Sequence, residues 1–161
     1  MFNYQVVDPA QGHALRNLAL IRPIAGGQAE SHFFLVHVTI SAISQKVVKC
    51  IESSLGIAQD DEGIATLLSN LASISDGISQ AQALLKEMYH GCDASEFNNF
   101  RKLLHGPSHG SKVFPDGVIF EGVSDEPRFY AGASGAHDAF LPLIDAFVAL
   151  TDTFRSNDLQ F

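Results

Sequence analysis

The apolar positions between Glu30 and Leu55 recur at close to helical spacing, which predicts one long amphipathic helix. β-Branched residues at 36–40 would also suit a strand, but the pattern runs on too far for one. Gly56 marks the expected end of this helix. The positions that carry the pattern are Phe33, Phe34, Val36, His37, Ile40, Ile43, Val47, Val48 and Ile51.

Three further helices follow from the same reasoning. Asp60 and Asp61 supply an N-cap and acidic first turn for a long helix that ends near Gly91. Asp93 with Glu96 three residues later resembles a capping box, and the helix it starts should stop at Gly106 and Pro107. A last helix is expected over 134–150, with a possible kink at Pro142.

The fold class predicted from these elements is all-α, a helical bundle of about four main helices. Residues 1–29 contain the turn sequences "DPAQG" and "AGGQ" and are expected to be an irregular lead-in, with the helical domain over 30–161. Residues 107–133 are expected to form a long loop in which "GVIFEGV" is the one strand candidate.

Composition narrows the range of partners. Ten Lys and Arg against 18 Asp and Glu give a net charge of −8, which argues against nucleic acid or an anionic membrane. Charged residues make up only 17%, against about 25% in a typical soluble domain, so some apolar surface is expected to meet a partner, a missing segment or a cofactor.

The cysteines and the N-terminus predict a reduced, cytoplasmic protein. Cys50 and Cys92 are far apart and lack the spacing of a zinc site or a disulfide framework. The N-terminal residues show no signal peptide, and no uninterrupted apolar run approaches the roughly 18 residues of a membrane span.

Two helical stripes carry candidate chemistry. Phe33 and His37 are four residues apart, and Phe97, Arg101 and Leu104 share a second face. An arginine in apolar surroundings is costly without an anion, so Arg101 is predicted to bind a ligand carboxylate or phosphate.

Each candidate has a plainer structural alternative. Arg101 could pair with an internal acid such as Asp145 or Glu121. His37 could be a packed histidine bonded to a backbone carbonyl, and "YAGASGAHDAF" (130–140) could be an ordinary loop with Ser134 as N-cap rather than a ligand-binding segment. The chain carries no HExxH, GxSxG or P-loop motif.

Taken together, several segments resemble the heme-dependent indoleamine 2,3-dioxygenases, in the family's order and close to its spacing. The resemblance covers about Leu18 to Phe147 and implies the helical large domain that holds heme. It also implies the family's reaction, in which dioxygen is inserted across the indole C2–C3 bond of L-tryptophan or a related indoleamine to give N-formylkynurenine. The segments are "GGQAESHFFLVHVTI", "LLKEMYHGCD", "FNNFRKLLHG", "FPDGVIFEGVSDEPRFYAGASGAHDAF" and "LIDAF".

The resemblance also implies site residues. His37 would be a distal polar group above the indole, and Arg101 would bind the substrate carboxylate. The apolar walls of the substrate site would be Phe33, Phe97 and Leu104. Beside heme and the substrate ammonium would lie the small-residue segment of Ala133, Ser134 and Gly135.

The family's N-terminal region and its proximal-histidine segment have no counterpart here, so a domain incomplete at both ends is expected. None of the seven histidines matches the heme-iron ligand, and no metal ligand is assigned. The expected partners are an indoleamine, dioxygen, and either a second copy or a completing polypeptide. Two alternatives stay open: a non-enzymatic helical module for oligomerisation or binding, and a sister tryptophan-modifying heme enzyme of secondary metabolism.

Overall fold

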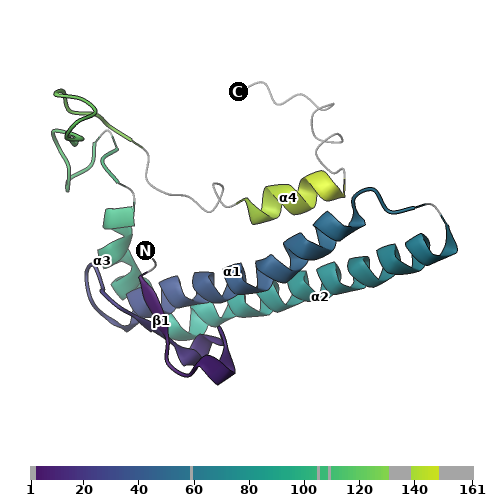
Figure 1. The fold of residues 1–161 in the computed structure, drawn as a ribbon. Coiled ribbons are helices and arrows are strands. Elements are labelled where there is room, and N and C mark those ends of the chain that lie inside the picture. The colour runs from purple at the N-terminus through teal and green to yellow at the C-terminus, as the bar shows by residue number, and fades with distance from the viewer. Residues whose placement is uncertain (1–2, 59, 105, 109, 131–138, 149–161) are drawn as a thin grey trace. The chain divides into compact units, whose positions relative to one another are not determined.

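The structure is a computed structural model that describes residues 3–58, 60–104, 106–108, 110–130 and 139–148 (Figure 1). Its contacts divide these residues into two compact units. The first unit comprises described residues up to His37 together with those from Lys86 to Tyr130, and the second comprises those from Val38 to Leu85 together with 139–148. The predicted boundary at residue 29 stays a prediction.

The three long predicted helices are present, and the fold is all-α in character as expected. They are α1 (Gln28–Ser54), α2 (Asp61–Gly91) and α3 (Ala94–Leu104). The predicted caps form as well: Asp60 Oδ1 accepts the Gly63 N–H at 2.8 Å, and Asp93 Oδ1 accepts the N–H groups of Ser95 and Glu96 at 2.8 and 3.2 Å. These bonds satisfy N–H groups that a helix start leaves without an intrahelical partner.

The first unit contains a small hairpin where an irregular lead-in was expected. Strand β1 (Tyr4–Val6) pairs antiparallel with β2 (Leu18–Leu20), Tyr4 facing Leu20. Asn17 holds the connection, because its side-chain amide bonds the backbone of Asp8 in both directions, at 2.9 and 2.7 Å. Three-residue strands are too short to show an alternating pattern, so this part of the prediction was wrong.

The strand candidate at 117–123 forms only an isolated bridge. Val118 and Arg128 exchange backbone hydrogen bonds at 3.0 and 2.9 Å, and no extended strand surrounds them in the described loop.

In the second unit, α1 and α2 run antiparallel. The face of α2 that packs against α1 includes Asn70, Ile74 and Gly77, which are spaced by four and three residues. The side-chain amide of Asn70 donates to the hydroxyls of Ser53 and Ser54, while Gly77 lies further along α2 against Val47. A Cβ at Gly77 would overlap the Val47 side chain, so glycine permits the close approach of the helices.

The core of the second unit gathers side chains from α1, α2 and α4 (Phe140–Phe147). Its buried members are Val47, Ile51, Ile74 and Ile144, with Cys50, Phe140, Leu143 and Phe147 packed against them. Helix α4 falls within the predicted range of 134–150, whose remaining residues lie outside the described ones. Pro142 occupies the first turn of α4, where a missing N–H costs nothing.

Helix α1 is long and apolar enough to cross a membrane by length and composition, with a mean hydropathy of 1.4 over an 18-residue window. Core helices of globular proteins pass the same test, although only 28% of this window is buried here. The feature therefore does not by itself indicate a membrane.

Candidate functional site

Four of the predicted site residues form a continuous row in the first unit, across α1 and α3. The His37 ring lies 4.5 Å from the Phe33 ring, and the Phe33 ring lies 5.3 Å from the Phe97 ring. The Arg101 guanidinium carbon then lies 5.9 Å from the centre of the Phe97 ring. We call these four residues the aromatic row. The i, i+4 spacing on each helix brings its two members together, and the contact of Phe33 with Phe97 joins the helices.

Phe100 is a buried residue that packs against the aromatic row. It is 3% exposed, and its ring lies 5.6 Å from Phe33 and 5.0 Å from Phe97. The Phe34 ring also lies near Phe100, with 6.3 Å between the ring centroids. Such tilted and edge-to-face pairs are favourable beyond their buried area. The sequence interpretation did not single out Phe100, although its spacing of three from Phe97 places both on one side of α3.

His37 combines features of both predicted readings. Its Nδ1 donates to the Phe33 carbonyl at 2.8 Å, as the plainer alternative expected, but the residue is exposed rather than buried. Because a carbonyl can only accept, Nδ1 carries a proton in this contact.

Arg101 is exposed, so the expectation of a guanidinium in apolar surroundings was wrong. It forms no ion pair with any described residue of its own unit, Glu121 included; Asp145 belongs to the other unit. The exposed guanidinium lies beside the Phe97 ring, and its N–H groups, which point outward in the guanidinium plane, suit a carboxylate.

The other predicted residues contribute less to this geometry. Leu104, the last residue of α3, is half-buried. Ala133, Ser134 and Gly135 lie outside the described residues. Their assignments stay predictions.

Two acidic side chains organise the start of α1, just before Phe33. The Glu30 carboxylate is 1% exposed and accepts the N–H groups of Ile24, Ala25 and Gly26 at 2.6, 2.9 and 2.8 Å. Glu96, from α3, accepts the Ala29 N–H at 3.2 Å. The sequence pattern placed Glu96 in a capping-box-like start and Glu30 only at the start of the long helix, and it indicated neither set of partners.

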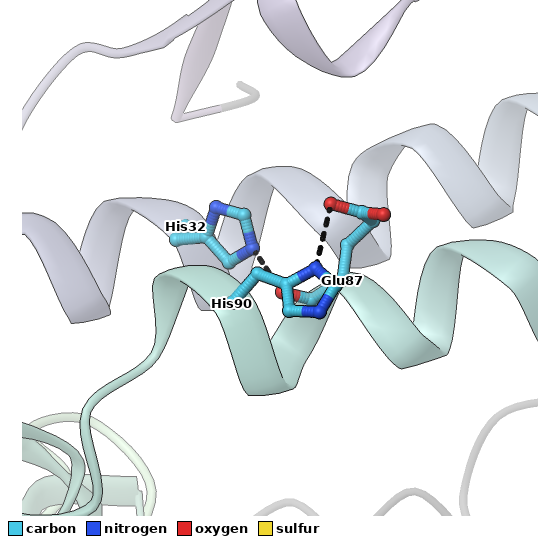
Figure 2. Close-up of polar contacts among 3 residues, drawn as sticks. All are labelled: His32, Glu87 and His90. Carbon is cyan, nitrogen blue, oxygen red and sulfur yellow. Dashed lines mark hydrogen bonds and ion pairs between the residues drawn. The ribbon is translucent and has the colours of Figure 1, made fainter.

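Next to Phe33 on α1, His32 contacts the last turns of α2 (Figure 2). Its Nε2 donates to the Glu87 carbonyl at 2.8 Å, while His90 Nδ1 lies 3.6 Å from the Glu87 carboxylate. A Cβ at Gly91 would overlap the His32 ring, so the absence of a side chain there allows the contact. His32 is therefore a structural residue.

The aromatic row is suited to an organic ligand rather than to a metal ion. The aromatic row offers apolar rings with a guanidinium donor at one end and an imidazole at the other, which suits a flat aromatic ligand carrying a carboxylate. Among the described residues no three histidine, cysteine or acidic side chains are grouped to hold a metal ion. The described histidines that have polar contacts make them with protein groups, as His13 does with the Tyr4 hydroxyl at 3.3 Å. Both cysteines are free, as expected.

Comparison with known proteins identifies the family of the chain. The family model described as indoleamine 2,3-dioxygenase matches residues 1–159. Indoleamine 2,3-dioxygenase 1 of Rattus norvegicus is 22% identical over 92% of this chain and 36% of its own length. Indoleamine 2,3-dioxygenase 2 of Homo sapiens is 24% identical over 99% of this chain and 39% of its own length.

A third relative has a different name. Myoglobin of Haliotis diversicolor is 29% identical over 73% of this chain and 30% of its own length. The chain thus spans less than two-fifths of each of these relatives. Because the family model matches nearly every residue, the chain belongs to the indoleamine 2,3-dioxygenase family.

Proposed function

We propose that the chain contributes the substrate side of a heme-dependent dioxygenase that acts on L-tryptophan or a related indoleamine. The observation that carries this proposal is the aromatic row, which joins four family-suggested residues from two helices in one series of contacts. Family membership supports the reaction class.

The row offers a separate role to each part of the substrate. Phe33 and Phe97 would pack against the indole ring, and the Arg101 guanidinium would donate to the substrate carboxylate. The His37 imidazole, beside Phe33, would act as a distal polar group that hydrogen-bonds the indole N–H or orders water. These contacts would hold the indole in one orientation, so that its reaction with dioxygen becomes effectively unimolecular.

Heme, bound beside this face, would supply the activation of dioxygen. Both oxygen atoms enter the product: the indole C2–C3 bond breaks, two carbonyl groups form, and no external reductant is consumed. The residues of this chain would orient the substrate and limit the access of water to it.

The direct test is to load the full chain with hemin and titrate L-tryptophan against the visible spectrum, then to reduce the heme iron to the ferrous state, admit dioxygen and analyse the products for N-formylkynurenine. Arg101→Ala should weaken L-tryptophan binding by about tenfold, the lower end of the effect of losing a charged hydrogen-bond partner, because the guanidinium is exposed. Lys102→Ala is the matched control, since Lys102 is an exposed cation on the same helix. Equal effects of the two substitutions would contradict the assignment of Arg101.

The match to a protein named myoglobin favours a second candidate, a heme protein that binds dioxygen without oxidising a substrate. This candidate predicts a stable dioxygen adduct of the hemin-loaded, reduced chain and no product when L-tryptophan is added. The dioxygenase proposal predicts consumption of one dioxygen for each N-formylkynurenine formed.

A further inference from the structure

Helix α1 begins without a capping side chain of its own. The residue before it is Gly27, which has a φ of 110° and no side chain to accept from the first turn. N-caps normally supply an oxygen for the N–H two or three residues later, here that of Ala29 or Glu30. Ala29 is 1% exposed, so water does not readily replace the missing acceptor.

Glu96 supplies the missing oxygen from α3. Its Oε2 accepts the Ala29 N–H at 3.2 Å across 67 residues of chain. A Cβ at Gly27 would lie 3.6 Å from the same oxygen, which confirms that the carboxylate lies at the cap position. Glu30, the third residue of α1, binds instead the N–H groups of Ile24, Ala25 and Gly26, which precede the cap position, so it does not replace Glu96 there.

This use of Glu96 departs from its local role. Asp93 Oδ1 accepts the Glu96 N–H at 3.2 Å, which is one half of a capping box within α3. In the reciprocal half the glutamate side chain would return to the Asp93 N–H, but here it extends to α1 instead. The carboxylate therefore links the two helices rather than completing the cap of its own.

We infer that Glu96 is a positioning residue that sets the placement of α3 against α1 and so aligns the aromatic row. Phe97 follows Glu96 directly, and Arg101 lies just over one turn further along α3. Phe33 lies one turn after Ala29 on α1. A bond from Glu96 to Ala29 thus fixes the helices within one turn of the contact of Phe33 with Phe97. The consequence for ligand binding rests on the proposed function; the alignment itself does not.

The test compares Glu96→Ala, Glu96→Gln and Glu62→Ala in the full chain. Glu96→Gln keeps an acceptor oxygen and removes the charge. Glu62 is an exposed acid in the first turn of α2, and the structure shows no bond from its side chain to another helix. Glu62→Ala is therefore the control for losing a first-turn negative charge without losing a contact between helices. Three quantities are measured by NMR and titration: hydrogen exchange of the Ala29 amide, the nuclear Overhauser effect between the Phe33 and Phe97 rings, and the dissociation constant of L-tryptophan for the hemin-loaded chain.

Glu96→Ala should accelerate exchange of the Ala29 amide by about 2- to 30-fold, the range expected for loss of a helix cap. It should also weaken the ring-to-ring signal and raise the L-tryptophan dissociation constant at least about threefold, because the row is no longer aligned before binding. Glu96→Gln should retain most of each property, and Glu62→Ala should change none of them.

Unchanged exchange at Ala29 in Glu96→Ala would overturn the inference. Faster exchange with an unchanged ring-to-ring signal would overturn it too, since Glu96 would then cap α1 without aligning the row. If Glu96→Ala does not fold, Glu96→Gln decides the question. Loss of its ring-to-ring signal to the level of an unfolded chain would also overturn the inference. A wild-type chain that binds no L-tryptophan would contradict the proposed function, while the two NMR measurements would still decide the role of Glu96.

Discussion

Replacing Phe100 by alanine should destabilise the first unit more than any other truncation of the aromatic contacts. Phe100 is 3% exposed, and its ring contacts the rings of Phe33, Phe34 and Phe97 at centroid distances of 5.0–6.3 Å. A buried phenylalanine removes about 150–250 Å² from water, which at about 25 cal/mol per Å² gives an upper value of roughly 4–6 kcal/mol. Measured Phe→Ala substitutions in protein cores cost about 3–5 kcal/mol, and we expect that range here.

The cost should appear in thermal unfolding followed by circular dichroism. In a chain of this size about 1 kcal/mol lowers the melting temperature by roughly 2–4 °C, so Phe100→Ala should lower it by about 6–20 °C. Phe120→Ala is the control, because Phe120 is 43% exposed and the structure shows one ring contact for it, with Tyr130 at 5.4 Å. A loss of melting temperature in Phe100→Ala no greater than that in Phe120→Ala would refute the claim that Phe100 is the packing centre of this unit.

Three smaller predictions concern the ends of the helices. Gly91→Ala should lower the melting temperature although alanine favours helix by about 1 kcal/mol, because the new methyl group overlaps the His32 ring and overpacking costs about 1–3 kcal/mol; a higher melting temperature would contradict this. The pKa of the Cys92 thiol is raised by burial and then by the Asp93 carboxylate, so its alkylation by iodoacetamide should be slow at neutral pH and accelerate only above the usual range for a cysteine. The pKa of Asp93 is lowered by its bond from the Ser95 hydroxyl and by the backbone N–H groups it caps, so the start of α3 should be fully capped above the ordinary value of 3.8 and lose its cap as the pH falls through the lower folded value. The protection of the Ser95 amide from hydrogen exchange, measured against pH in the wild type and in Asp93→Asn, would detect the loss of the cap. Protection in the wild type that does not change with pH would contradict the prediction.

The long helices could be predicted from sequence because their signals are local. Spacing of apolar residues and the caps at Asp60 and Asp93 depend on neighbours within about one turn, and the structure reproduces them closely. The hairpin of residues 4–20 was missed because its geometry depends on Asn17, whose side-chain bonds to Asp8 span nine residues and leave no periodic trace.

The candidate site was predictable to the level of helix faces. The i, i+4 spacing placed Phe33 with His37 and Phe97 with Arg101, and both pairs are found in contact. Spacing alone cannot show which helix packs against which, so Phe100 and the bond from Glu96 to Ala29 were not foreseen. Arg101 was expected in apolar surroundings because it shares a helix face with Phe97 and Leu104. Residue spacing does not show whether such a face is buried or exposed, and Arg101 is exposed.

The shared cap at the start of α1 has a consequence for the order of folding. During synthesis α1 leaves the ribosome about 65 residues before Glu96, so its first turn must wait for an acceptor that has not yet been made. The body of α1 can form early through local contacts, whereas its leading turn should be among the last segments to acquire protection in pulsed hydrogen exchange. A nascent chain ending before α3 would then expose a frayed helix start, and release of the next fifteen or so residues would close it.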